Sequence, residues 1–241
     1  MERDEMAENG GTEGWDQSQR EEMSRFEKQA AFFLRADGEK GIVRQTYIGD
    51  GSRKESDAEH AWSLALGVLL FSEYANEKID VLKTITMVLI HDIVEIEAGD
   101  TYAYDYAGQA SAHEREKKAA EDLFGMLPED QGQRFYALWE EFEAYESPEA
   151  CFAHTLDNFQ PLQLNGATGG RSWAEHGVRK ENVLRRNEKT PEGSEKIWAY
   201  MRTIIDQYFP ESQGGALSEE VQRRWGKDCK EEAAGATKKY E

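Results

Sequence analysis

Cysteine is nearly absent from this chain of 241 residues, which contains only Cys151 and Cys229. A disulfide framework or a cysteine metal site needs more cysteines at regular spacing, so both are excluded. Long apolar runs are also missing, because AWSLALGVLLF ends at Ser72, short of the roughly 18 residues that a membrane-spanning helix needs. The N-terminus lacks the basic start and apolar centre of a signal peptide. We therefore expect a cytoplasmic protein without a membrane partner.

Basic residues are scarce: 29 Lys and Arg stand against 48 Asp and Glu, which gives a net charge of -19. Binding to a nucleic-acid backbone requires clustered basic side chains, so nucleic acid is excluded as a partner. A small anion can still bind through one basic residue or a metal ion. The hydrophobic share of 39% is enough for one sizeable core.

Alternating apolar and polar residues, the pattern typical of a strand, form no convincing run, whereas nearly every segment has a helical period. The sequence therefore predicts an all-α fold. Residues 1–20 are acidic and without apolar periodicity, which predicts a disordered leader. The helical domain is expected over 21–210, and residues 211–241 are expected to form a charged, flexible tail with room for a short helix.

Turn and capping residues divide the domain into helices. Asp57 and Asp80 are expected N-caps, the second of a helix that ends at Gly99. The segment GIVRQTYIGDGSRKES between the first two helices is expected to be a loop, because it contains three glycines. The other expected helices cover 26–36, 111–126, 128–146 and 147–164, with two or three short ones between 172 and 209.

The stretch LIHDIVEIEAGDT places charge where a core helix is expected. Val81, Ile85 and Val88 form an inward stripe, and the next position on that stripe is Asp92. His91 lies about 100° round the helix from Asp92, so both side chains can reach a ligand between these directions. A buried carboxylate costs several kcal/mol unless a partner compensates it.

Other helices direct similar groups inward. His60 lies on the face that Leu64 continues, Asp157 shares a face with Leu164, and Glu95 follows His91 by four residues. Alone, His60 is compatible with a hydrogen-bonded core residue and Asp157 with a cap or a solvated residue. Together with the His91–Asp92 pair they leave a net negative site between the central helices. A divalent cation compensates it: imidazole and carboxylate suit Mn, Fe, Co or Zn, and Mg if oxygen ligands prevail.

The stretches AEHAW, LIHDIVEIEAGDT and FAHTLDNFQPL carry a family resemblance. The ordered set of His60, the His91–Asp92 pair and Asp157 resembles the HD-domain metal-dependent phosphohydrolases, and within them the 5'-deoxynucleotidase-like branch. The resemblance covers about residues 26 to 205. It implies an HD-domain helical bundle and a homodimer. It also implies that His60, His91, Asp92 and Asp157 are the metal ligands.

The same resemblance assigns further roles. Glu95 and Asp100 match acidic catalytic positions, and Arg44 matches an arginine that holds the substrate phosphate. The family has a tryptophan after that arginine, where this chain has Gln45, so the sugar and base preference stays open. Glu95 is suited to orient the attacking water or accept its proton. Asp100, which follows a helix end, is interpreted as a contact to a sugar hydroxyl or the water, or as a cap.

These residues predict a metal-dependent phosphohydrolase that releases phosphate from small monoesters, (deoxy)nucleoside 5'-monophosphates above all. A di-iron oxygenase of the same fold would need additional histidines between Asp92 and Asp157. Only His113, in a charged run, and His154 are available there, and neither is well placed. A non-catalytic interaction or sensing module is the third hypothesis, but it has no evident need for Glu95.

Overall fold

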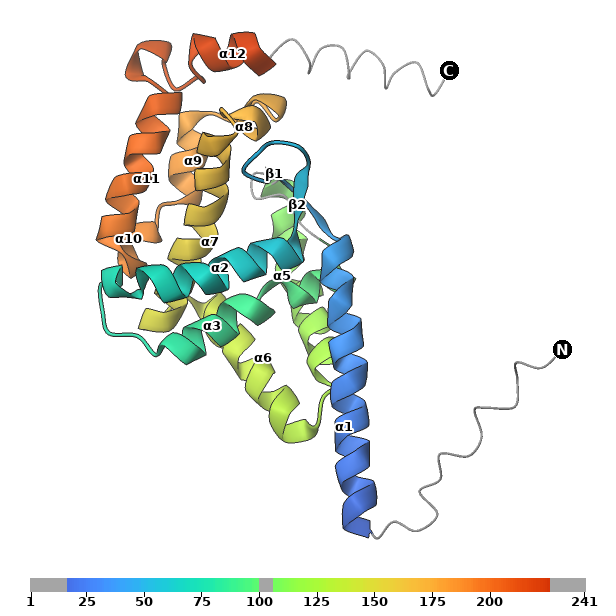
Figure 1. Ribbon diagram of the computed structural model, residues 1–241. Helices are drawn as coiled ribbons and strands as arrows, with labels where there is room; N and C mark the ends of the chain where they lie inside the picture. Colours follow the sequence, from blue (N-terminus) through green and yellow to red (C-terminus); the bar gives the residue numbers. More distant parts are fainter. Residues whose placement is uncertain (1–16, 100–105, 226–241) are drawn as a thin grey trace, which may run out of the picture.

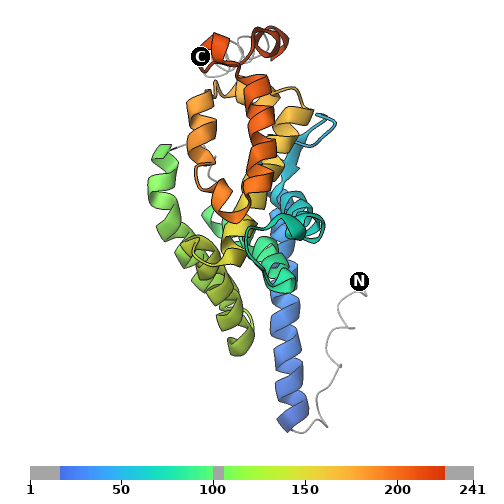
Figure 2. The same ribbon diagram turned by 90° about the vertical axis from the view of Figure 1, so that its left-hand side faces the viewer.

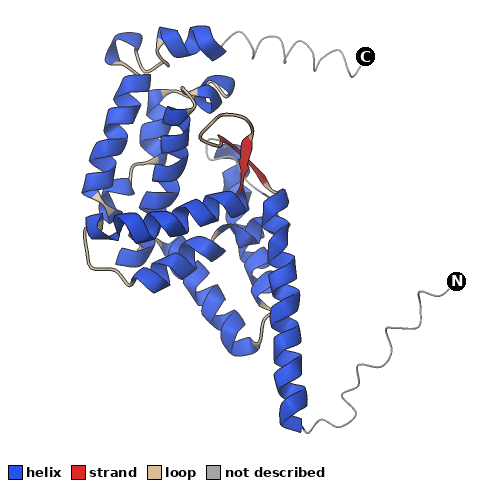
Figure 3. Ribbon diagram, viewed as in Figure 1, coloured by secondary structure: helices blue, strands red, loops and turns tan. Residues whose placement is uncertain are grey.

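The computed structural model describes residues 17–99 and 106–225, and helices form most of this part of the chain (Figures 1 and 3). The prediction of an all-α fold is therefore confirmed. The twelve α-helices of the described residues are α1 (Gln17–Ala36), α2 (Asp57–Phe71), α3 (Val81–Ile90), α4 (Glu95–Ala98), α5 (Tyr106–Phe124), α6 (Glu129–Ala144), α7 (Pro148–Ala167), α8 (Arg171–Glu175), α9 (Lys180–Arg186), α10 (Thr190–Gly193), α11 (Glu195–Tyr208) and α12 (Glu219–Trp225). Short 3₁₀ helices are η1 (Asp37–Gly41), η2 (Ser72–Tyr74), η3 (Asp92–Val94) and η4 (Glu211–Gln213).

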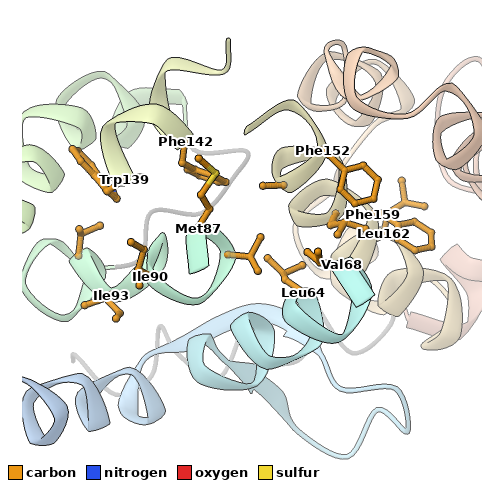
Figure 4. Packing of buried hydrophobic residues seen from close by; sticks show 14 of the residues in the cluster. Leu64, Val68, Met87, Ile90, Ile93, Trp139, Phe142, Phe152, Phe159 and Leu162 are labelled. Carbon is orange, nitrogen blue, oxygen red and sulfur yellow. The ribbon is translucent and has the colours of Figure 1, made fainter. Parts of the chain in front are cut away.

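Helix α7 is the centre of the bundle and packs against α2, α3, α6, α10 and α11. Figure 4 shows Leu64 and Val68 of α2 beside Phe159 of α7, and Met87 of α3 beside Phe142 of α6. All five side chains are buried. Figures 1 and 2 show that the N-terminal turns of α1 extend beyond the rest of the bundle. Because α2 and α3 both pack against α7, the polar groups that these helices direct inward meet at the middle of the domain.

A short hairpin replaces the predicted loop before α2. Strands β1 (Val43–Tyr47) and β2 (Lys54–Ser56) pair antiparallel, with Val43 opposite Ser56. Between them Gly51 has φ 71°, and Asp50 Oδ1 accepts a hydrogen bond from Ser52 N at 2.8 Å. The loop prediction was wrong because five residues and three residues are too few for alternation to be detected, although Val, Thr and Tyr favour strands.

The expected single helix from Asp80 to Gly99 is interrupted after Ile90. Asp80 does cap its start by accepting from Lys83 N at 3.0 Å, and Gly99, with φ 79°, follows its end. The interruption has a local cause. Nδ1 of His91 lies 3.0 Å from the Val88 carbonyl, which an undistorted helix would pair with the Asp92 amide. The chain then tightens into the 3₁₀ turn η3.

The start of α2 also differs from expectation. Ser56, not Asp57, is the N-cap: its hydroxyl accepts from Glu59 N, and the Glu59 carboxylate accepts from Ser56 N at 3.0 Å. This reciprocal pair is a capping box. Asp57 is consequently the first helical residue, and its fully buried side chain points to the interior. The predicted cap thus becomes part of the polar interior.

Residues after 210 continue the packed domain. Leu217 and Val221 are buried in the core, and the indole of Trp225 donates to Gly169 O at 3.0 Å. The boundary predicted at residue 210 is therefore wrong for 211–225, since apolar residues at a spacing of four give α12 a buried face. Four helices, not two or three, lie between 171 and 208. The rest of the predicted tail and residues 1–16 of the predicted leader lie outside the described residues. Among the described helices none combines the length and the apolar character that a membrane span requires.

Candidate metal centre

Three side chains that are distant in sequence meet inside the described structure. His60 comes from α2, His91 from the residue after α3, and Asp157 from α7. Their potential ligand atoms all lie within 4.8 Å of one another, with His60 Nε2 3.0 Å from Asp157 Oδ1. All three residues are buried. The set combines two imidazoles and one carboxylate, a mixture that suits Mn, Fe, Co or Zn.

Asp92 lies at the edge of this set. Its Oδ2 is 3.2 Å from His91 Nε2 and 3.9 Å from His60 Nε2. The same oxygen accepts a hydrogen bond from Arg44 Nη1 at 2.8 Å. Asp92 therefore lies between the two histidines on one side and the positively charged Arg44 on the other.

His91 presents one nitrogen to the centre. Nδ1 donates to Val88 O, so the other nitrogen, Nε2, carries the lone pair in the neutral ring. Among the described residues, Nε2 of His91 has no hydrogen-bond partner, although it is buried. Burial alone would lower the pKa of His91, but the Asp92 and Asp157 carboxylates outweigh it and raise the pKa to about 9. The surroundings of Nε2 thus favour a positive charge, either a proton or a cation.

Both nitrogens of His60 face oxygen atoms. Nδ1 lies 2.9 Å from Gln160 Oε1, and Nε2 lies 3.0 Å from Asp157 Oδ1. A neutral imidazole has one N–H and can satisfy only one of them. Complete burial, followed by the charge of Arg44, lowers the pKa of His60 and opposes a second proton. A cation between Nε2 and the carboxylate removes this conflict, so the donor set fits a divalent metal.

Arg44 lies on the other side of Asp92. Strand β1 directs it inward, where its Nη1 also donates to Asp57 Oδ1 at 3.1 Å. Burial opposes its charge, yet Asp92, Asp157 and Asp57 raise the pKa of Arg44, so the guanidinium stays charged. A planar guanidinium suits recognition of a phosphate by paired hydrogen bonds.

Further carboxyl groups surround the arginine. Burial, followed by the charge of Asp92, raises the pKa of Glu39 to about 7 and that of Asp57 to about 6. Burial also raises the pKa of Glu55 to about 7, and Arg44 partly offsets this. Burial therefore opposes the charge of three carboxyl groups that lie around a single buried arginine among the described residues. This excess of negative charge favours binding of an additional cation.

Arg186 was not singled out in the sequence. From the last residue of α9, its Nη2 donates to Asp157 Oδ2 at 3.2 Å, and its side chain is 39% exposed. The pKa of Asp157 lies well below its usual value, because His60, His91 and Arg186 outweigh the effect of burial. No spacing or motif links Arg186 to Asp157, since the contact depends on how α9 returns to α7.

The other predicted site residues have separate surroundings. Glu95 begins α4 and lies beside Asp57 and Arg44. Gln45 is not brought to the histidines: its Oε1 accepts from Lys54 Nζ at 2.5 Å across the hairpin. Neighbouring residues of a strand point to opposite faces, so Gln45 and Arg44 diverge. Asp100 lies outside the described residues.

The remaining candidate histidines do not join the centre. His154 stacks on Phe142 and Tyr145, with ring centroids 3.8 and 4.2 Å apart, and burial lowers its pKa to about 4. Its Nε2 donates to Phe142 O at 2.8 Å. His113 is exposed, as expected. His154 therefore supports the packing of α6 on α7.

The fold and the centre together define a helical protein with a buried His and Asp cluster between its central helices. The model of the HD domain family matches residues 36–198. The chain belongs to this family, which confirms the resemblance found in its motifs.

Two kinds of relatives extend this result. The chain is 32% identical to 5'-deoxynucleotidase HDDC2 of Bos taurus over 132 residues, and 30% identical to that of Homo sapiens over the same length. Each match covers 54% of this chain and 63% of the relative, so the chain spans about three fifths of these proteins. A crystal structure of a predicted metal-dependent phosphohydrolase from Magnetospirillum magnetotacticum MS-1 is 42% identical, with a TM-score of 0.74, and the match covers 81% of this chain and 100% of that one.

Proposed function

We propose that this protein is a divalent-metal-dependent phosphohydrolase that releases phosphate from small monoesters, above all (deoxy)nucleoside 5'-monophosphates. The proposal rests on one observation: the His and Asp cluster, whose donors fit a cation, is linked through Asp92 to the charged Arg44. Asp92 Oδ2 lies 3.2 Å from His91 Nε2 and 2.8 Å from Arg44 Nη1. A phosphate monoester is an anion whose oxygens can be bound by a divalent cation and by a guanidinium at the same time.

The proposed metal ligands are His60, His91, Asp92 and Asp157. A divalent ion held there, whether Mn, Co, Mg, Zn or Fe, would polarise a phosphoryl oxygen and lower the pKa of water. Arg44 binds the substrate phosphate and neutralises its charge. Glu95, beside Arg44 and Asp57, orients the attacking water and accepts its proton. Asp100 is proposed to contact the water or a sugar hydroxyl.

The nucleotide substrate class rests on the relatives. The HDDC2 proteins of Bos taurus and Homo sapiens are named 5'-deoxynucleotidases. Gln45, where the family has tryptophan, is proposed to alter how the nucleoside is held. Its amide accepts from Lys54 Nζ, so this part of the hairpin presents polar groups in place of an aromatic ring.

A phosphate-release assay tests the proposal. Purified protein is supplied with Mn, Co or Mg and a panel of ribo- and deoxynucleoside 5'-monophosphates and simpler phosphomonoesters. We expect turnover of at least one nucleotide, and loss of turnover with retained fold in Asp92→Ala. Protein with measured metal content that hydrolyses none of the panel contradicts the proposal.

The same fold can support two other functions. A di-iron oxygenase needs more histidines near the centre, and the described part of the chain directs neither His113 nor His154 to it. Metal analysis with redox spectroscopy separates an iron oxygenase from a phosphohydrolase. A non-catalytic sensing module predicts ligand binding without turnover, so the assay with Asp92→Ala also addresses this hypothesis.

A homodimer is proposed as the working assembly. Large apolar side chains are exposed on neighbouring helices, among them Phe33 (81%) and Leu34 (76%) on α1, and Trp62 (65%) and Leu69 (61%) on α2. Such side chains mark interaction surfaces when they gather in one patch. Light scattering of the wild type and of Trp62→Glu/Leu69→Glu tests this: we expect a dimer for the first and a monomer for the second. The cytoplasmic location stays a prediction.

A further inference from the structure

The nitrogen of His60 that faces away from the centre is held by two side chains from different elements. Gln160 of α7 lies with Oε1 2.9 Å from His60 Nδ1, and its Nε2 donates to Glu55 Oε1 of β2 at 2.6 Å. His60 is fully buried and Glu55 is 3% exposed. The contacts form an unbranched chain from the hairpin through α7 to the imidazole.

The chemistry of the amide gives this chain a direction. Gln160 has one accepting end and one donating end, and its donating Nε2 end lies at Glu55 Oε1. Because Glu55 takes the NH₂ end, the carbonyl end faces His60, and His60 Nδ1 must donate to it. The neutral imidazole then has its lone pair on Nε2, which faces Asp157 and lies 3.9 Å from Asp92 Oδ2.

His60 and His91 both donate from Nδ1, but to different kinds of acceptor. His91 donates from Nδ1 to the Val88 carbonyl three residues earlier, a contact built into its own helix. The corresponding partner of His60 would be the carbonyl of Asp57 or Ser56, but no such bond is formed, and Nδ1 points to Gln160. His60 therefore depends on residues far away in the sequence for its orientation.

We infer that Gln160 and Glu55 are positioning residues that hold His60 as the Nδ1–H tautomer, so that its Nε2 binds the metal ion. The inference rests on the proposed metal centre, but it does not depend on which substrate is hydrolysed. Groups that orient a metal-binding histidine typically change metal affinity by 10- to 100-fold when they are removed.

The position of Glu55 links this chain to the phosphate-binding side. Arg44 lies on β1 and Glu55 on β2, next to the paired residues Val43 and Ser56, and the register of the hairpin shifts between Val43 and Tyr47. The charge of Arg44 also acts on the Glu55 carboxyl. The hairpin thus carries both the arginine and the group that orients a metal ligand, and Glu55 is the buried residue of β2.

Metal affinity measures the inference without any turnover. Co(II) is titrated into the full metal-free chain and followed by calorimetry and by its visible absorption. We expect Gln160→Leu, which is close in volume but has no acceptor, to raise the Co(II) dissociation constant by about 10-fold or more. The matched control is Gln163→Leu, three residues further on the same helix, which should stay within about twofold of the wild type.

An exchange of the two side chains separates orientation from folding. In Glu55→Gln/Gln160→Glu, the carboxylate at 160 accepts from His60 Nδ1 and the amide at 55 donates to it. We expect this double variant to bind Co(II) more tightly than either single variant, close to the wild type. Equal affinities of Gln160→Leu and Gln163→Leu, or an exchange variant no better than the single ones, would overturn the inference.

A measurement on the wild type needs no variant. In Zn(II)-loaded protein with ¹⁵N-labelled histidine, we expect the His60 proton on Nδ1, protected from exchange. A proton on Nε2 overturns the inference, as does the absence of any Co(II) or Zn(II) binding. Failure of the proposed function has a different signature: metal binding that depends on Gln160, but no phosphate release from any monoester.

Discussion

The centre has two parts, which meet at Asp92 and differ in whether the chain itself places a positive charge there. On the ligand side, His60, His91 and Asp157 bring donor atoms together, and Nε2 of His91 lacks a hydrogen-bond partner among the described residues. On the arginine side, Arg44 supplies a fixed positive charge that hydrogen-bonds Asp57 and Asp92. The ligand side is thus built for a cation that the chain does not supply. The arginine side already has its cation and can offer it to an anion.

The largest effect is expected from the ligand side. Asp157→Asn keeps the size of the side chain but removes a charge 3.0 Å from His60 Nε2. We expect loss of Co(II) binding and of phosphate release, because an amide is a weak ligand beside two imidazoles. Calorimetry and the phosphate assay measure both, with Asp122→Asn, a change at an exposed residue of α5, as the control. Retained Co(II) affinity in Asp157→Asn would mean that the ligand side lies elsewhere.

A change on the arginine side should separate the two functions. Arg44→Lys keeps the positive charge but loses the planar pair of donors. We expect kcat/KM to fall by about 100-fold or more, as for removal of one donor to a developing charge, while Co(II) affinity stays within a few-fold. The control is Arg25→Lys, whose arginine pairs with Asp130 at 2.6 Å on the surface. Equal losses of metal affinity and turnover in Arg44→Lys would remove the distinction between the two sides.

The buried carboxyl groups should make the free energy of unfolding depend on pH. Burial and Asp92 raise the pKa of Glu39 to about 7. The folded state therefore holds this proton more tightly than the unfolded state, and the resulting stabilisation is lost as the pH rises from about 4.5 through 7. In metal-free protein Glu39→Gln should be more stable than the wild type at pH 8, by up to about 3 kcal/mol, with little gain near pH 4.

Urea unfolding at both pH values measures this difference. Glu27→Gln on the exposed face of α1 is the control, and it should change stability little at either pH. A gain for Glu39→Gln that is the same at pH 4 and pH 8 would contradict a raised pKa in the folded protein.

The convergence of His60, His91 and Asp157 could be predicted from the sequence far better than the residues that contact them. His60 and Asp157 lie on apolar helical faces, and Asp92 continues the apolar stripe of α3 in the sequence, so the period of 3.6 residues predicts their direction without knowledge of the fold. Gln160, Glu55 and Arg186 contribute through contacts between elements. Glu55 lies on a three-residue strand and Arg186 on a seven-residue helix, both too short for a periodic signal.

Local hydrogen bonds also could not be predicted from the hydrophobic pattern of the sequence. The helical period continues unbroken through His91, but its imidazole takes the Val88 carbonyl and the chain tightens there. Periodicity reports which side of a helix is apolar and not which group pairs with each carbonyl. Likewise Ser56 and Asp57 are both suitable caps by residue type, and only Glu59, three residues after Ser56, distinguishes them through the capping box.

The smallest effect is expected for Arg186, which contacts the ligand side from α9. Arg186 donates to Asp157 Oδ2 at 3.2 Å, but its side chain is 39% exposed, so solvent screens its charge. In Arg186→Gln the carboxylate loses a competing cation, and Co(II) should bind about two- to fivefold more tightly at low salt. High salt should abolish the difference, because exposed charges are screened over a few ångströms. Arg185→Gln, the exposed neighbour on the same helix, has the same change of charge and should have no such effect. Weaker binding in Arg186→Gln would instead mean that Arg186 orients Asp157. The ligand side would then depend on an arginine, as the arginine side does.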